Sequence, residues 1–189
     1  NTVKRYEAFQ VALERDLKNR AATCRPEIDF VLARRDDCAV LVKQQEEGTL
    51  PLRVTHNDTK LNNILFDGET EKGLCIIDLD TIMPGLAAND FGDSIRFGAA
   101  TAEEDERDLD KMHFDIGLYE LYVKGYLESA GDVLTDEEIE SLPWGARLMT
   151  LECGIRFLTD YLQGDTYFKT DYPEHNLVRT RTQFRLVDE

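Results

Sequence analysis

The stretch VTHNDTKLNNILFD, Val54 to Asp67, decides how the rest of the chain is interpreted. It places His56, Asp58 and Asn63 between two short apolar runs. A connector that only reversed the chain between two strands would need two to five residues, mostly Gly, Asn or Asp. This one is longer, and its side chains are of kinds that perform chemistry. Asp and Asn that bond to their own backbone in an ordinary turn are the alternative explanation.

Short runs typical of β-strands surround this loop. Two of them are separated by a charged segment with a glycine at either side, which suits a hairpin loop. The runs are LRV at 52–54, NILF at 63–66 and LCII at 74–77, with DGETEKG at 67–73. The last run ends directly before Asp78. We expect this arrangement to bring Asp58, Asn63 and Asp78 together at the ends of short strands.

These three side chains suit phosphoryl transfer. Asn63 and Asp78 offer hard oxygen ligands, which Mg²⁺ prefers when it keeps several waters and binds substrate phosphates. Asp58 is then placed to orient an attacking hydroxyl and accept its proton. Asp80, two residues after Asp78, either reaches the metal through water or bonds to nearby backbone; the sequence leaves both open.

The rest of the chain shows helical periodicity, so we predict an α+β fold that is mainly α, a single domain over residues 1–189 with a small β-hairpin island. A Thr-x-x-Glu capping box at Thr135 to Glu138 opens a short helix. We expect Pro143 to end that helix and to lie at the first turn of the next. The expected helices are 3–20, 26–48 with a break near Asp36, 107–131, a short one from 135, 144–163, and a last one from 174 or 176.

Composition excludes several classes of function. The chain has 38 acidic and 22 basic residues, a formal charge of −16. Binding to nucleic acid or to an anionic membrane needs a basic face, so neither is expected. The four cysteines are widely scattered and show no metal or redox spacing, which is typical of reduced thiols in a cytoplasmic protein. No apolar run approaches the roughly 18 residues of a membrane span.

The motifs resemble those of a known family. HNDTKLNN matches the H-x-D-x-x-x-x-N catalytic loop of protein kinases and their small-molecule relatives. CIIDLDT and NDFGDSIRF resemble the two following motifs of the aminoglycoside phosphotransferase and choline kinase family, which has a protein-kinase-like fold. With LECGIRFLTDYLQGD downstream, the chain looks closest to the bacterial N-acetylhexosamine 1-kinases.

The resemblance implies a small-molecule kinase that uses ATP and Mg. It makes Asp58 the catalytic base and Asn63 and Asp78 the metal ligands, with His56 and Asp90 as structural supports of the catalytic loop. The implied acceptor is a sugar, with the anomeric hydroxyl of an N-acetylhexosamine favoured. Aminoglycosides, or an amino alcohol such as choline, are alternatives, and so is a lobe without catalytic activity, either a pseudokinase or a scaffold.

Four residues are candidates for binding the acceptor: Lys60, Asp93, Arg96 and Arg156. Asp93 and Arg96 are three residues apart, so an ion pair on one helix is the alternative. Arg156 follows Glu152 by four residues and has the same alternative. Three tyrosines at helical spacing, Tyr119, Tyr122 and Tyr126, suit a core better than a stacking platform.

Two departures from the family pattern matter. Protein kinases carry the metal-binding Asp in a D-F-G triplet, but here Asp78 stands in DLD and the DFG triplet comes later, at Asp90 to Gly92. We expect Asp78 to be the ligand, because it ends an apolar strand. No Gly-rich loop or strand Lys for the nucleotide phosphates precedes the first helix. The resemblance therefore implies the C-terminal lobe of a longer parent, a lobe that binds ATP poorly without its N-terminal partner lobe.

Overall fold

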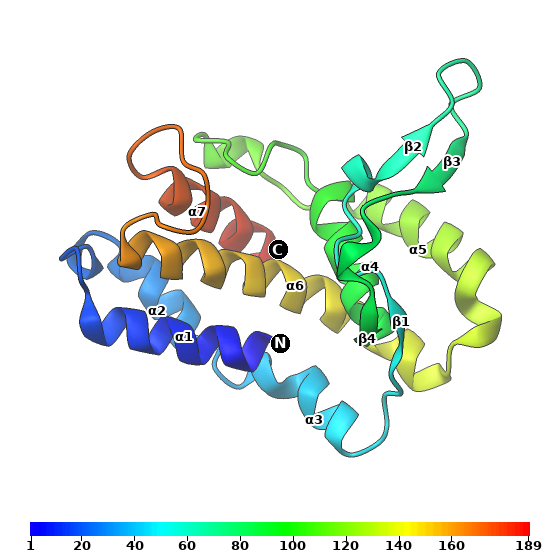
Figure 1. Ribbon diagram of the computed structural model, residues 1–189, viewed down its shortest axis with the longest axis horizontal. Coiled ribbons are helices and arrows are strands. Elements are labelled where there is room, and N and C mark those ends of the chain that lie inside the picture. Colours follow the sequence, from blue (N-terminus) through cyan, green and yellow to red (C-terminus); the bar gives the residue numbers. More distant parts are fainter.

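The computed structural model describes residues 1–189 and consists mainly of helices, with two small antiparallel sheets at one side (Figure 1). This confirms the predicted α+β, mainly helical class. No helix combines the length and the apolar character needed to cross a membrane. The helices are α1 (Thr2–Arg15), α2 (Arg25–Ala33), α3 (Val40–Glu46), α4 (Ala87–Gly98), α5 (Ile116–Ala130), α6 (Asp136–Gln163) and α7 (His175–Asp188).

The long helix α6 is the centre of the molecule. Helices α1, α4 and α7 all pack against it, as Figure 1 shows. Its buried face carries Leu148, Leu151, Ile155, Leu158 and Leu162, which belong to the main hydrophobic core together with side chains of α1, α2, α3 and α7. Burying a large aliphatic side chain stabilises a fold by roughly 1.5–3 kcal/mol, so this face holds the helices together.

The four strands form two separate pairs. Strand β1 (Arg53–Thr55) pairs with β4 (Met83–Gly85), and β2 (Ile64–Phe66) pairs with β3 (Gly73–Ile76). The β2–β3 hairpin extends away from the helices in Figure 1. The predicted strand runs and the hairpin are confirmed. Strand β4 was not expected, because three residues that include a proline give little signal.

Helices α4 and α6 cross at two glycines. A Cβ atom on Gly92 would lie 2.1 Å from the carbonyl oxygen of Gly145, and one on Gly145 would lie 2.0 Å from that of Ala88. The residue before Gly92, Phe91, is buried and makes edge contacts with Tyr119, Tyr122 and Tyr126 of α5. The DFG triplet therefore fixes α4 between α5 and α6, and the three tyrosines belong to this smaller core.

Two helix boundaries differ from prediction. Helix α1 stops at Arg15, because Asp16 takes a left-handed conformation and its carboxylate accepts the backbone N–H groups of Arg20 and Ala21. Leu17 is consequently exposed. Helix α5 begins only at Ile116, where Asp115 caps it by accepting the N–H of Leu118. Before Asp115 the chain forms a short 3₁₀ helix at Leu109–Lys111 and a single antiparallel β-bridge between Phe114 and Ala100.

Pro143 does not divide α6. The capping box at Thr135 is confirmed, but the helix that it opens continues without a break to Gln163. Proline in a helix interior costs on the order of 3 kcal/mol. Buried residues on both sides of it, among them Leu142 and Leu148, keep one continuous face against the core. Tertiary packing thus outweighs the local signal.

Candidate active site

The loop from His56 to Asn63 rests on the N-terminal part of α4. The carboxylate of Asp90 accepts the backbone N–H of His56 at 2.7 Å and that of Asn57 at 2.8 Å. Burial raises the pKa of Asp90 above its ordinary value, although these two hydrogen bonds oppose the rise. Both carboxylate oxygens are thus engaged with backbone donors, as expected for a residue that stiffens the loop.

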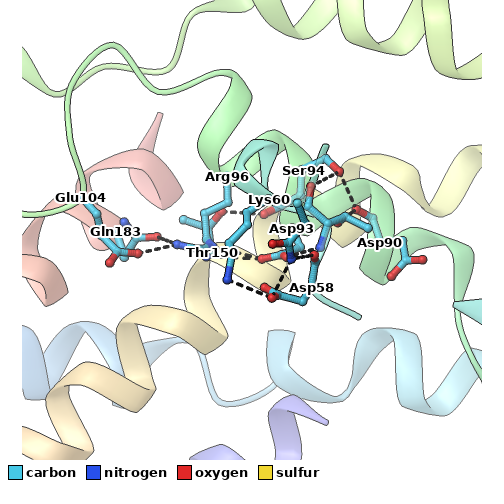
Figure 2. A network of polar contacts seen from close by, with 12 residues as sticks. Asp58, Lys60, Asp90, Asp93, Ser94, Arg96, Glu104, Thr150 and Gln183 are labelled. Carbon is cyan, nitrogen blue, oxygen red and sulfur yellow. Dashed lines mark hydrogen bonds and ion pairs between the residues drawn. The ribbon is translucent and has the colours of Figure 1, made fainter. Parts of the chain in front are cut away.

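Two more residues of the same helix face hold Thr59, which directly follows Asp58. The N–H of Thr59 donates to Asp93 at 3.0 Å, and its hydroxyl donates to the carbonyl of Asp90 at 2.6 Å. The Ser94 hydroxyl donates to the carbonyl oxygen of Thr59 at 3.1 Å. Asp90, Asp93 and Ser94 are neighbours on one face because they are three and four residues apart. Figure 2 shows these side chains with Asp58.

The other side of the loop is held by the segment after β3. The ring of His56 accepts the N–H of Asp58 at Nδ1, so Nε2 carries the hydrogen that bonds to the carbonyl of Ile77 at 2.9 Å. The Thr81 hydroxyl donates to the carbonyl of His56 at 2.6 Å. Asn57 has a positive φ of 65° and donates from its amide to the carbonyl oxygens of Thr55 and Thr81. Both ring nitrogens of His56 are thus engaged with backbone atoms.

Asp58 has two polar partners. Its carboxylate oxygen Oδ2 lies 2.9 Å from Lys60 Nζ and accepts the side-chain N–H of Asn63 at 2.9 Å. Asn63 also donates to the backbone carbonyl of Asp58 at 2.8 Å. Partial burial works to raise the pKa of Asp58, but the hydrogen bonds from Lys60 and Asn63 outweigh it and the pKa is lowered. The carboxylate is therefore ionised near neutral pH, as a proton acceptor must be.

The hairpin brings the two expected metal ligands to adjacent ends of neighbouring strands: Asn63 directly precedes β2, and Asp78 follows the end of β3 by two residues. The N–H of Ile77 donates to the carbonyl of Asn63 at 2.9 Å, which places Asp78 one residue beyond that contact. Asp78 has a left-handed backbone (φ 63°) and starts a short turn, Leu79–Thr81. The strand has ended there, so Asp80 lies in the turn that follows Asp78.

These residues fit a magnesium ion. The amide nitrogen of Asn63 is bonded to Asp58, and its oxygen Oδ1 makes no hydrogen bond within the protein. The carboxylates of Asp78 and Asp80 are exposed and have no protein partner, so Asp80 does not bond to nearby backbone. Nowhere does the chain gather three His, Cys, Asp or Glu side chains in a metal-binding group. One or two carboxylates with an amide oxygen and waters is a donor set that Mg²⁺ uses, whereas Zn²⁺ needs more protein ligands.

A pocket of about 230 Å³ lies beside Asp58. Its walls come from the catalytic loop, the hairpin, α4 and α5, and they include Lys60, Asn63, Ile76, Tyr122 and Tyr126. A polar floor with an ionised carboxylate and a lysine, next to aromatic walls, can receive a small hydroxyl-bearing molecule.

Asp93 and Arg96 are placed together, as their spacing predicted. Arg96 Nη2 lies 3.3 Å from Asp93 Oδ1, and only 9% of the Arg96 side chain is exposed. The guanidinium also donates to Glu104 at 2.6 Å. Both residues are thus occupied by protein partners.

Arg156 lies in a different part of the molecule. Its guanidinium is 5.9 Å from the ring centroid of Tyr167, and with Arg5 it lines a pocket of about 170 Å³. It forms no ion pair with Glu152, whose carboxylate instead accepts the hydroxyl hydrogen of Thr2 at 2.7 Å. The ion-pair alternative for Arg156 is therefore wrong.

Sequence reasoning missed four residues that fix the loop: Asn57, Thr59, Thr81 and Ser94. Their contacts are mostly with backbone atoms, which no motif records. One signal for Ser94 was present in the sequence. Asp90, Asp93 and Ser94 have i, i+3, i+4 spacing, and this spacing predicts a polar face on one helix.

One family model matches the chain, and it describes a phosphotransferase enzyme family. The match extends over residues 2–126, well over half of the 189 residues, so the chain belongs to this family. The matched range contains the catalytic loop, the hairpin and α4, and it ends within α5. Membership makes the chain a phosphotransferase of small molecules by class, in agreement with the loop geometry.

Proposed function

We propose that the chain is the catalytic lobe of an ATP- and Mg-dependent kinase that phosphorylates the anomeric hydroxyl of an N-acetylhexosamine. The observation that carries the proposal is the fixed, ionised carboxylate of Asp58 between Lys60 and Asn63, at the wall of a pocket for a small molecule. The choice of acceptor rests on the resemblance of the flanking segments to the N-acetylhexosamine 1-kinases.

In this proposal each residue of the loop has a role. Asp58 orients the acceptor hydroxyl and takes its proton as the oxygen attacks. Lys60 brings a positive charge to the same spot, where phosphoryl transfer develops negative charge. Asn63 and Asp78, with Asp80 as a further candidate, would hold Mg²⁺, which when bound neutralises the charge of the nucleotide phosphates.

For the acceptor itself we propose Lys60 as a contact, because Lys60 lines the pocket of Asp58. Arg156 lines a separate pocket beside Tyr167, so it is a weaker candidate for an acceptor that reacts at Asp58. The tight contacts of Asp93 and Arg96 with protein groups make them weaker candidates for touching the acceptor.

A choline-type acceptor is the second candidate, and one observation favours it. Tyr122 and Tyr126 line the pocket of Asp58, with ring centroids 6.4 Å apart. Aromatic rings attract quaternary ammonium groups. Both rings also pack on Phe91, which ties them to the core and leaves them less free to surround a cation. An aminoglycoside would be attracted by the net charge of −16 alone.

We also propose that an N-terminal nucleotide-binding lobe of the same parent protein covers the β-strand side of this lobe. Large apolar side chains are exposed there, with Val54 at 85%, Leu74 at 64% and Ile76 at 60%. Large apolar side chains exposed on both sheets favour a surface that another part of the protein covers. Because it adjoins Asp78, a lobe seated on it would hold a nucleotide next to the metal ligands. Residues 1–189 alone should then bind Mg-ATP only weakly, which calorimetric titration measures; micromolar affinity would contradict this.

The test of the function is ADP release by the full-length protein with Mg-ATP. The panel contains N-acetylglucosamine, N-acetylgalactosamine, choline and kanamycin, and Asp58→Asn is the matched control because it keeps the shape of the side chain. Turnover with an amino sugar that disappears in Asp58→Asn supports the proposal. Turnover with choline alone, or with kanamycin alone, would contradict the sugar acceptor and support the corresponding alternative acceptor. No turnover with any of the four, in a protein that binds Mg-ATP, would contradict the proposed acceptors and leave the fold and the metal site as described.

A further inference from the structure

A chain of charged groups, in which Asp93 is buried and Glu104 is partly exposed, connects the catalytic loop to a distant part of the fold. It begins at Asp93, whose Oδ2 accepts the N–H of Thr59 at 3.0 Å. The second oxygen, Oδ1, accepts from Arg96 through Nε at 3.4 Å and Nη2 at 3.3 Å. Asp93 therefore joins the residue after Asp58 to the guanidinium of Arg96. Asp93 and Arg96 are labelled in Figure 2.

Arg96 has a second carboxylate partner. Its Nη1 donates to Glu104 Oε1 at 2.6 Å and, more weakly, to Gln183 Oε1 at 3.4 Å. Glu104 belongs to the segment between α4 and α5. Its own carbonyl oxygen accepts the hydroxyl hydrogen of Thr182 on α7 at 2.5 Å, so it is tied to a third element. The guanidinium is consequently held from two sides, by Asp93 on α4 and by Glu104 in the segment that follows α4.

The surroundings of Arg96 restrict the orientation of its guanidinium. Its side chain is 9% exposed, and its guanidinium carbon lies 4.0 Å from the centroid of the Phe97 ring. A planar guanidinium that bridges two carboxylates has a fixed orientation, which a lysine ammonium cannot reproduce. Without Arg96, Asp93 would be a poorly compensated buried carboxylate and would turn toward other donors or solvent.

We propose that Arg96 is a positioning residue. Glu104 fixes the guanidinium of Arg96, and Arg96 in turn fixes the carboxylate of Asp93. Asp93 then holds the backbone amide of Thr59, which sets the direction of the neighbouring Asp58 carboxylate. The proposal rests on the proposed function for its kinetic part alone. Glu104 acts on the catalytic loop through two intermediates and needs no contact with the acceptor.

The direct test is amide hydrogen exchange at Thr59, followed by NMR in the full-length protein. Glu104→Gln removes the charge that clamps Arg96 and keeps the side-chain shape, and Arg96→Lys keeps the charge and removes the fork. Both should lower the protection of the Thr59 amide about tenfold or more. The matched control is Glu103→Gln, because Glu103 is exposed, belongs to the same segment and makes no side-chain bond.

The kinetic arm uses the same variants. Glu104→Gln should lower kcat about 10- to 100-fold while KM for ATP and acceptor stays within about twofold, because a small misplacement of a catalytic group affects the reaction more than binding. Arg96→Lys should lower kcat by a similar factor but change the melting temperature little, because it keeps the charge and loses only the planar fork.

The outcomes separate the two proposals. Loss of Thr59 protection together with lower kcat supports the positioning role. Unchanged protection, or unchanged kcat in an active protein whose Thr59 protection has fallen, overturns it. If the unmutated protein phosphorylates none of the acceptors, the proposed function fails; the exchange measurement then decides whether Arg96 and Glu104 fix the loop.

Discussion

Gly92 on α4 lies so close to Gly145 on α6 that no side chain fits between them: a Cβ atom on Gly92 would lie 2.1 Å from the Gly145 carbonyl oxygen. The obstacle is backbone and cannot rotate away.

Gly92→Ala should therefore push the helices apart and lower the free energy of unfolding by about 1–3 kcal/mol. Because Asp90 and Asp93 lie on the same helix, turnover should fall as well. Thermal denaturation measures the first effect. Gly98→Ala, at a site with open space on the same helix, is the control. Equal stability of the two variants would contradict the close crossing.

Asp90→Asn should loosen the catalytic loop. The carboxylate accepts two backbone N–H groups, and an Asn side chain offers one acceptor oxygen and one NH₂ group. One of the two N–H groups loses its partner, which costs about 1–3 kcal/mol when the site is buried. We expect faster amide exchange at His56 or Asn57 and a large loss of kcat with a modest change in melting temperature. Exchange rates equal to those of the unmutated protein would show that Asp90 does not hold the loop.

Lys60→Met should shift the pH dependence of turnover. The pKa of Asp58 is lowered because contacts with Lys60 and Asn63 outweigh partial burial. Without Lys60 the burial effect remains, so the pKa of Asp58 rises. The acidic limb of kcat/KM then moves to higher pH, which a profile from about pH 4 to 8 measures. Lys72→Met, at an exposed position in the hairpin loop, is the control and should leave the limb unchanged.

The same contacts have a stability signature. A carboxylate whose folded-state pKa is lowered contributes stability above its unfolded pKa of about 3.9. That contribution is lost as the pH falls through the folded-state value. Lys60→Met should therefore lower the melting temperature near neutral pH and leave it nearly unchanged below about pH 3. A difference between the two proteins that persists at the lowest pH would have another cause.

Asp78→Asn should weaken metal binding. It replaces an anionic oxygen ligand by a neutral one, so the Mg²⁺ concentration for half-maximal activity should rise about tenfold or more. Mn²⁺ binding, followed by electron paramagnetic resonance, gives a readout independent of turnover. Asp80→Asn distinguishes the two carboxylates: an effect as large as that of Asp78→Asn would make Asp80 a direct ligand.

Sequence reasoning succeeded where the information is local. The three strand runs, the β2–β3 hairpin and the capping box at Thr135 were all predicted, because each depends on residues a few positions apart. The contact between Asp58 and Asn63 follows from the same loop. The start of α7 after Glu174 was also placed correctly.

What failed depends on contacts between distant segments. Pro143 predicts a break that packing on both sides of it overrides. The hydrogen bond from Thr59 to Asp93 joins residues 34 apart and uses a backbone donor, so the side chain of Thr59 gives no hint of it. The helix crossing at Gly92 was not predicted, because Gly92 belongs to the DFG triplet and that triplet was compared only with metal-binding motifs.

The loop from His56 to Asn63 is anchored largely through its main chain: the N–H groups of His56, Asn57 and Thr59 and two of its carbonyl oxygens all bond to side chains of other elements. Leu61, half exposed, takes no part in this anchoring. A substitution of the Leu61 side chain should therefore leave Asp58 in place. The direction of the reacting carboxylate is set by main-chain anchors, so it is insulated from changes in the side chains that the loop presents to solvent.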